Sequence, residues 1–216
     1  MKRIKSSRKE KKLFYLCVEG ECENLYFEHL KKLINQSNSK YLVDFQTKVE
    51  RSLHSFLSVY RPDCPVFYVW DHESTGIEDE SNFEKAFHEI LKFRKTYDIQ
   101  PGYTHLTFEL WILLHRGTVP AVGQKNNYLT IINDYYNKEF KNLSHYKQKD
   151  NFKQMLDSIS LEDVKLAIER GDFIRKQKSE RHERPRVYGC YKTYSIDPDL
   201  FLHECVKRIM KECKVY

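Results

Sequence analysis

The chain has 216 residues, of which 40% are hydrophobic and 31% are charged, and its formal net charge is +6. This length and balance fit one compact domain, and they exclude a disordered tail protein or a short disulfide-stapled peptide. The longest apolar runs, such as Val66–Trp70 and Leu110–Leu114, stop after about five residues, whereas a membrane helix needs roughly 20. We therefore expect no membrane span.

The N-terminal segment and the cysteines indicate where the protein resides. Residues 1–12 hold seven Lys/Arg and one Glu, and no apolar segment with a small-residue cleavage site follows them, as it would in a secretory signal. The six cysteines include no C-x-x-C pair. We therefore expect a cytoplasmic protein with reduced thiols, no disulfide and no zinc.

Positive charge gathers in two parts of the chain. Residues 1–12 are one part, and residues 174–192, with seven basic and two acidic residues, are the other. Such patches suit a polyanion, most simply nucleic acid, because neutralising phosphates supplies much of the affinity of these complexes. For residues 1–12 a solubilising arm is an equally good interpretation.

The first half of the chain alternates predicted strands with predicted helices. Leu13–Val18 is a continuous apolar run ended by Glu19-Gly20, which is typical of a buried parallel strand. From Glu23 to Ile34 apolar residues recur at helical spacing. The remaining predictions are a strand at Tyr41–Val49, a helix at Arg51–Tyr60, a strand at Val66–Trp70 and a helix at Asn82–Lys95. This order predicts an α/β fold with a parallel sheet flanked by helices.

The second half is predicted to be mainly helical. The expected helices are Phe108–His115, Tyr128–Phe140, Asn151–Ile159, Leu161–Lys176 and Pro198–Cys213. Ser160 stands three residues before Asp163 as a helix cap, and Asp197 precedes Pro198 at a first helical position. Residues 177–192 predict an exposed basic loop, with a short strand possible at Arg186–Tyr191.

Three segments follow from these predictions. They are a basic N-terminal arm at 1–12, an α/β core at 13–116 and a helical C-terminal portion at 117–216. We expect the C-terminal portion to pack on the core as one domain.

Acidic residues follow two of the predicted parallel strands. Glu19 and Glu23 come after the first strand, and Asp71 and Glu73 after the later one. Ligands of open α/β sheets bind at this edge. Four carboxylates converging there would repel one another unless a divalent cation neutralised them, and Mg²⁺ or Mn²⁺ prefers such oxygen ligands.

Each acid also has an ordinary interpretation. Acids are favourable in the first turn of any helix, so Glu23 could be a capping residue, and Asp71 and Glu73 could be solvated loop acids. Glu109 has apolar neighbours and therefore needs a partner, which we expect to be a metal or a lysine. His115 ends the same segment and is better explained as a helix cap than as a catalyst.

Three motifs in order resemble one known family. They are V-E-G-x-x-E at 18–23 followed by Tyr26-Phe27, the acidic pair at 71 and 73, and F-E-L-W-I-L-L-H at 108–115. Together they resemble the RloB family over roughly residues 13–210. The resemblance implies a Toprim-type fold, similarity to the nuclease part of the OLD proteins, and an association with bacterial phage defence, often beside an ATPase.

The resemblance also implies residue roles. Glu19 would be the acid that binds metal or acts as a general base, Glu23 the second acid of that motif, and Asp71 the first acid of a D-x-D pair. Glu73 stands where the second Asp is usual. Cys22 replaces a Thr, and His105-Leu106-Thr107 replaces Ser-Asn-Pro before F-E-L-W. Glu109 belongs to the third motif.

Two sources of positive charge could assist phosphoryl transfer. Lys147 aligns loosely with a Tyr and Lys feature of the family. The basic loop offers Arg184, Arg186 and Lys192 interleaved with Tyr188 and Tyr191, which would suit contacts with a flexible nucleic acid. A packed edge strand with solvated basic residues explains the loop equally well.

The sequence thus favours a metal-dependent nuclease of antiviral defence that uses Mg²⁺ or Mn²⁺ on DNA or RNA, including tRNA. Its catalytic residues would be Glu19, Asp71 and Lys147. The chain has no G-x-x-x-x-G-K-[ST] motif, so an ATPase would be a separate partner. A nucleic-acid-binding or scaffolding subunit without chemistry is the alternative, and an interaction protein with a merely solvated acidic cluster is a second. The sequence leaves a homo-oligomer open.

Overall fold

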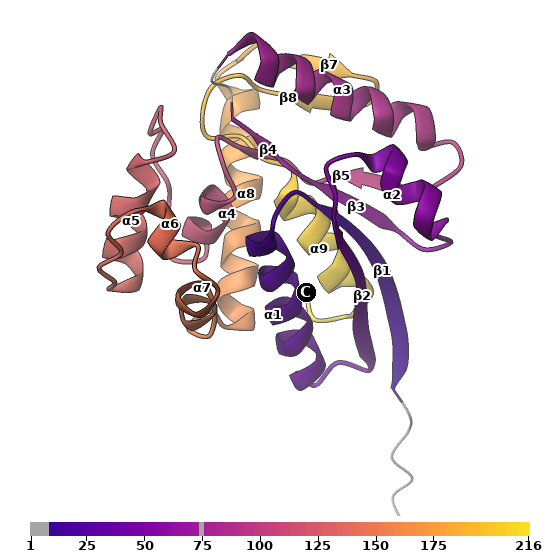
Figure 1. The fold of residues 1–216 in the computed structure, drawn as a ribbon, viewed down its shortest axis with the longest axis horizontal. Coiled ribbons are helices and arrows are strands. Elements are labelled where there is room, and N and C mark those ends of the chain that lie inside the picture. Colours follow the sequence, from indigo (N-terminus) through magenta and orange to yellow (C-terminus); the bar gives the residue numbers. More distant parts are fainter. Residues whose placement is uncertain (1–8, 74–75) are drawn as a thin grey trace, which may run out of the picture.

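A four-stranded parallel sheet forms the centre of the molecule (Figure 1). The structure is a computed structural model and describes residues 9–73 and 76–216. The strands lie in the order β2-β1-β3-β5, and all neighbours are parallel. Their bounds are Glu10–Val18 for β1, Tyr41–Val49 for β2, Val66–Val69 for β3 and Ile99–Pro101 for β5. The predicted α/β class is confirmed.

Strand β1 begins three residues earlier than we predicted. Its apolar part has buried residues on both faces of the sheet, with Leu16 in one core cluster and Cys17 in the other. Its polar start pairs with β2, where Lys11 Nζ lies 2.7 Å from an Asp44 carboxylate oxygen. Glu10–Lys12 therefore belong to the sheet rather than to an arm. Residues 1–8 of the predicted arm lie outside the described residues, and Lys9 precedes the strand.

Helices cover both faces of the sheet (Figure 1). Helices α1 (Glu21–Gln36) and α9 (Leu202–Glu212) lie on one face, and α8 (Leu161–Glu180) packs against both of them. Helices α2 (Leu53–Tyr60) and α3 (Ile77–Phe93) lie on the other face. The apolar strands are thus shielded from water on both sides, as parallel sheets require.

The chain changes direction across the sheet at β1. It passes from β1 through α1 to β2 on one side, and then through α2 to β3 on the other side of β1. The carboxyl ends of β1 and β3 therefore lie beside each other where the strand order reverses. Open α/β sheets bind ligands in the crevice at such a switch point.

The second half of the chain is mainly helical, as predicted. Its buried residues and those on the α1 face of the sheet form one continuous apolar cluster. Besides α8 and α9, its helices are α4 (Glu109–Leu114), α5 (Asn127–Tyr136), α6 (Leu143–Tyr146) and α7 (Lys149–Leu156). The C-terminal portion therefore shares a core with the sheet.

The shortest elements are absent from the predictions. Strand β4 (Asp71–His72) pairs in parallel with β6 (Thr104–His105), so Asp71 begins a second small sheet instead of lying in a loop. Neither β5 nor α6 was expected. A strand of two or three residues shows no hydrophobic period, so sequence patterning cannot reveal it.

The predicted caps have opposite outcomes. Ser160 caps α8 in a reciprocal capping box with Asp163, which confirms that prediction. Pro198 does not start α9, because the helix begins at Leu202. The Asp197 carboxylate instead accepts hydrogen bonds from the Val122 amide at 2.8 Å and the Tyr128 hydroxyl at 3.1 Å. That carboxylate anchors the segment before α5 rather than a helix start.

The predicted basic loop contains a hairpin. Helix α8 continues to Glu180, so the first residues of 177–192 are helical. Strands β7 (Arg186–Tyr188) and β8 (Tyr191–Thr193) then pair in antiparallel fashion beside α3 (Figure 1).

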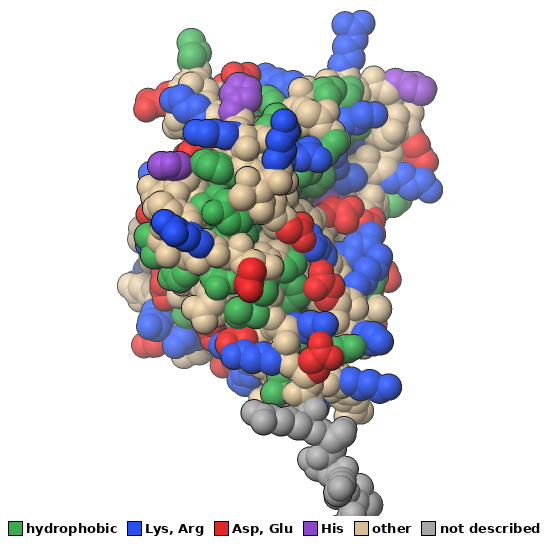
Figure 2. Space-filling model, turned by 90° about the vertical axis from the view of Figure 1, so that its right-hand side faces the viewer, with side chains coloured by type: hydrophobic (Ala, Val, Ile, Leu, Met, Phe, Trp, Pro, Cys, Tyr) green, Lys and Arg blue, Asp and Glu red, His purple; other side chains and the backbone are tan. Residues whose placement is uncertain are grey.

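The outer surface is mixed in character. Figure 2 shows basic, acidic and hydrophobic side chains interspersed over one face of the molecule, the right-hand side of Figure 1. Within residues 9–73 and 76–216, none of the helices combines the length and the apolar character needed to cross a membrane.

Candidate active site

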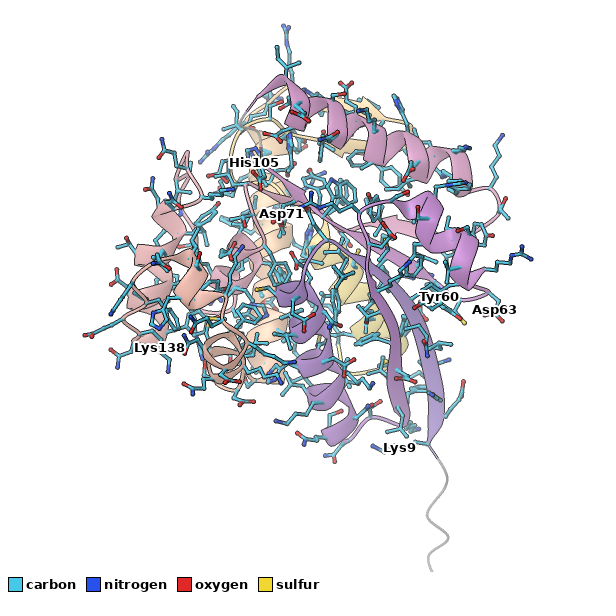
Figure 3. All side chains as sticks on the ribbon, viewed as in Figure 1. Lys9, Tyr60, Asp63, Asp71, His105 and Lys138 are labelled. Atoms are coloured by element: carbon cyan, nitrogen blue, oxygen red, sulfur yellow. The ribbon has the colours of Figure 1, made fainter. Side chains whose placement is uncertain are left out.

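Glu19 and Asp71 meet where β1 and β3 end. Glu19 Oε2 accepts a hydrogen bond of 3.0 Å from the backbone amide of Asp71, which ties the two strand ends together. Glu19 Oε1 lies 3.2 Å from a guanidinium nitrogen of Arg51, whose side chain is 82% exposed. Figure 3 labels Asp71 at this end of the sheet, with His105 close to it. The predicted convergence of these two strand ends is therefore present in the fold.

Two threonines hold the Asp71 carboxylate. Thr104 Oγ1 donates to Asp71 Oδ1 at 2.8 Å, and Thr107 Oγ1 lies 3.3 Å from Oδ2. Thr104 reaches this position because β6 pairs with β4. Burial raises the pKa of Asp71 well above its ordinary value, and the carboxylates of Glu23, Glu109 and Glu19 raise it further. Asp71 is thus a partly buried acid at the cavity wall, surrounded by other acids.

Glu23 lies in the first turn of α1 and is buried. Burial raises the pKa of Glu23 to about 7; its own backbone amide and Lys147 oppose the shift, and the Glu109 and Glu19 carboxylates add to it. A Cβ at Gly20 would lie 3.0 Å from Glu23 Oε2, so glycine leaves room for this carboxylate. Glu23 therefore interacts with the helix start, as the capping interpretation states, and also faces the other acids.

Glu109 is completely buried at the start of α4. Its Oε1 lies 3.1 Å from Lys147 Nζ, which confirms the expected lysine partner, yet no described residue gives that oxygen a well-aligned hydrogen bond. Its Oε2 accepts a hydrogen bond from Thr107 Oγ1. Although burial opposes it, the Glu109 and Asp71 carboxylates raise the pKa of Lys147. Lys147 therefore stays protonated and neutralises part of the charge.

We call Glu19, Glu23, Asp71 and Glu109 the acidic cluster. Its four carboxylates have two neighbouring cations, Lys147, whose side chain is 42% exposed, and Arg51, whose side chain is 82% exposed. The single Thr107 hydroxyl lies between Asp71 and Glu109 but has only one proton to donate. The cluster therefore has more negative charge and more acceptor oxygens than its neighbours satisfy.

The donor set fits a hard divalent cation. Carboxylate oxygens are the ligands that Mg²⁺ and Mn²⁺ prefer, and the buried Glu109 Oε1 lacks a hydrogen bond. The acids do not yet surround one point, because no three of them, within the described ranges, have ligand atoms within 4.8 Å of one another. Small side-chain rotations would have to accompany metal binding.

Glu73 stands apart from the cluster. A cavity of about 480 Å³ opens at the strand ends, and Glu19, Asp71 and Glu73 all contribute to its wall. Glu73 Oε2, however, pairs with Lys125 Nζ at 3.1 Å. The predicted metal ligand Glu73 therefore lies on the cavity wall in an ion pair, while Glu23 and Glu109 lie behind the wall.

The β7–β8 hairpin lies outside this cavity. Tyr188 stacks on Phe87 of α3, with ring centroids 4.6 Å apart, and Tyr191 contacts the same ring at 5.8 Å. Arg186 forms an ion pair with Glu80. Arg184 and Lys192 are exposed. The geometry of the two tyrosines matches a packed edge hairpin, whereas a nucleic-acid surface would require free rings.

Sequence patterns did not identify the two threonines or Arg51 as site residues. Thr107 was noted only as a departure from the family pattern, and Thr104 lies on the unpredicted strand β6. His115 has a structural place, because it is buried, its Nδ1 lies 2.9 Å from the Trp111 carbonyl oxygen and its Nε2 lies 3.2 Å from the Tyr26 hydroxyl. A polar residue between apolar neighbours was the one signal that could have pointed to Thr107.

Comparison with known proteins gives one relationship. Neither a search of curated proteins nor a search of solved structures finds a match. The family model of RloB-like proteins matches residues 14–195, which include the whole acidic cluster and Lys147. The chain therefore belongs to the RloB-like family.

Proposed function

We propose that this protein is a metal-dependent nuclease of the Toprim type that hydrolyses phosphodiester bonds of DNA or RNA in antiviral defence. The observation that supports this most directly is the acidic cluster itself. Four neighbouring carboxylates, two of them buried, outnumber their two cations, and this arrangement is costly for the free protein. Such an arrangement is expected where a divalent cation completes the site.

The residues of the cluster can be assigned distinct tasks. Glu19, Asp71 and a further cluster acid would hold Mg²⁺ or Mn²⁺. The cation would supply Lewis acidity, which polarises the phosphate and makes the attacking water more acidic. Glu23, with its pKa of about 7, can accept a proton near neutral pH. Lys147 remains cationic beside Glu109 and offers positive charge to the negative charge that develops on phosphate.

A nucleic acid could approach across the cavity at the strand ends. Arg51 and Lys85 contribute to the cavity wall, and Arg51 is 82% exposed. Lys125 pairs with Glu73, which belongs to this wall. These cations offer phosphate contacts nearer to the acids than the hairpin does. An ATPase partner, expected from the family resemblance, would act on this machinery from outside the chain.

One observation favours the alternative of a binding or scaffolding subunit without chemistry. The cluster acids do not already surround a single point, and Glu73 is held by Lys125 instead of facing Asp71. Such a subunit would bind nucleic acid but would be indifferent to loss of the acids.

The test is cleavage of plasmid, single-stranded DNA and total tRNA in Mg²⁺ or Mn²⁺, with and without the product of an adjacent ATPase gene. Asp71→Asn is compared with Asp63→Asn, which makes the same charge change at an exposed position near the amino end of β3 (Figure 3). We expect cleavage by the wild type and by Asp63→Asn only. Equal activity of all three proteins, or none under any condition, would refute the nuclease proposal.

A further inference from the structure

A second set of potential metal ligands lies between two helices of the C-terminal portion. Asp172 belongs to α8, and His203 and Glu204 belong to α9. One ligand atom from each lies within 4.8 Å of the others, and within the described ranges no other set of three satisfies this criterion. His203 Nε2 is 3.6 Å from Asp172 Oδ1 and 3.7 Å from Glu204 Oε1.

His203 is a buried imidazole without hydrogen-bond partners. Its side chain is 1% exposed, and its Nδ1 is buried with no partner among the described residues. Separations of 3.6 and 3.7 Å are too long for hydrogen bonds. Nε2 therefore faces the two carboxylates without a hydrogen bond, and an ion bound among the three groups would give it a partner.

The packing of α8 and α9 fixes the imidazole in this place. A Cβ at Gly171 would lie 2.7 Å from the Cβ and Cγ atoms of His203, so only glycine lets the ring lie against α8. Gly171 immediately precedes Asp172, which brings the Asp172 carboxylate to the edge of the ring. The carboxylates of Asp172 and Glu204 are 37% and 42% exposed, so solvent and ions reach the open side.

We propose that Asp172, His203 and Glu204 bind a divalent transition-metal ion of the Zn²⁺ or Co²⁺ type, at a site separate from the acidic cluster. A neutral imidazole with two carboxylates is a usual ligand set for such ions, and water can complete the coordination. With metal–ligand bonds of about 2.0–2.1 Å, ligand atoms in a tetrahedral site lie roughly 3.4 Å apart. The observed separations require only small movements. The expected absence of zinc rested on the cysteines, and none of them belongs to this set.

Lys207 already pairs with Asp172 and would compete with a metal ion for this carboxylate. Its Nζ lies 2.9 and 2.7 Å from the two oxygens of Asp172. Metal binding must displace this ammonium group, because both cations use the same carboxylate. Loss of a partly exposed ion pair of about 1 kcal/mol corresponds to about fivefold in affinity. Removal of Lys207 should therefore tighten metal binding by about that factor.

A metal at this place would link the two helices. Helix α9 covers the sheet and α8 packs against α9, so a bound ion joins elements distant in sequence. Ligands that bind only the folded state raise stability by mass action. Zn²⁺ should therefore raise the melting temperature through residues that the nuclease proposal does not use.

The experiment is titration of full-length protein without a histidine tag with Co²⁺ in excess Mg²⁺, followed by the visible absorbance of protein-bound Co²⁺. Zn²⁺ competition and thermal unfolding serve as second measurements. The test variant is Glu204→Gln, which changes an exposed carboxylate and spares the fold. The matched control is Glu212→Gln, which also lies on α9 but pairs with Arg208. Asp71→Asn tests whether the ion lies in the acidic cluster instead.

We expect about one Co²⁺ per chain in the wild type, in Glu212→Gln and in Asp71→Asn. Affinity should fall at least about tenfold in Glu204→Gln and rise about fivefold in Lys207→Gln. Equal affinity in the wild type and in Glu204→Gln would overturn the proposal. So would loss of the Co²⁺ signal in Asp71→Asn, or absence of any signal in the wild type. None of these outcomes affects the cleavage test, because the two sites share no residue.

Discussion

The acidic cluster and the β7–β8 hairpin are both charged regions that the sequence singled out. They differ in how far their charges are compensated by partners. In the hairpin, Arg186 has Glu80 as a partner and the Tyr188 ring stacks on Phe87. In the cluster, four acids outnumber two cations, and the pKa of the buried Glu23 rises to about 7 through burial and its neighbours. Unsatisfied buried charge indicates a site more directly than charge density does.

The largest expected difference between the two regions concerns cleavage. If the nuclease proposal is correct, Glu19→Gln should lower the rate of metal-dependent cleavage by about 100-fold or more, because a metal-holding carboxylate is lost. Arg184→Gln, in the hairpin segment, should change the rate by less than about threefold. Single-turnover cleavage at saturating Mg²⁺ measures both. A greater loss in Arg184→Gln than in Glu19→Gln would reverse the comparison.

Removal of the cation beside Glu109 should destabilise the cluster. In Lys147→Met the fully buried Glu109 loses its ion-pair partner. A broken, fully buried pair costs about 3–5 kcal/mol. Lys147 is 42% exposed, so we expect a smaller fall of about 2 kcal/mol in the free energy of unfolding. Urea unfolding measures this fall, and the double variant Lys147→Met/Glu109→Gln should recover most of it. A double variant as unstable as Lys147→Met would contradict the pairing.

The cluster should also give the metal-free protein a pH dependence. The pKa of Glu23 is about 7 in the folded protein and near 4.5 in an unconstrained chain, so the folded state binds more protons between these values. Stability contributed by this group therefore decreases as pH rises from about 4.5 to about 7. Urea unfolding in EDTA at several pH values should show a flatter profile for Glu23→Gln than for the wild type. Parallel profiles would rule out this role of Glu23.

The smallest expected effect belongs to the hairpin. Tyr188→Ala removes the stacking on Phe87 and should lower the free energy of unfolding by about 1 kcal/mol. Tyr188→Phe keeps the ring and should be near wild type. If Tyr188 instead stacks on nucleic acid, Tyr188→Ala would weaken DNA and RNA binding while unfolding stays unchanged. Fluorescence anisotropy alongside urea unfolding distinguishes these results.

The sequence by itself determined the fold class and the candidate acids. Hydrophobic period and run length identified β1, β2, β3 and the long helices, because these patterns are local to each segment. The placement of Glu19 and Asp71 after two parallel strands predicted that they lie at one edge, and the hydrogen bond from the Asp71 amide to Glu19 agrees with it. The predicted start of α9 is wrong because the Asp197 side chain, expected to precede the helix, binds Val122 and Tyr128, which are distant in sequence.

Only the tertiary structure decided which charges meet. Lys147 directly follows the short helix α6, which has no clear pattern, yet its Nζ contacts Glu109. Thr104 reaches Asp71 through a strand of two residues. The stacking of Tyr188 on Phe87 likewise depends on the position of α3, which periodicity does not give. The physical reason is the distance in sequence over which each feature is set. Hydrophobic periodicity shows which side of a segment is buried, whereas the partners of a charge lie on segments far apart in sequence.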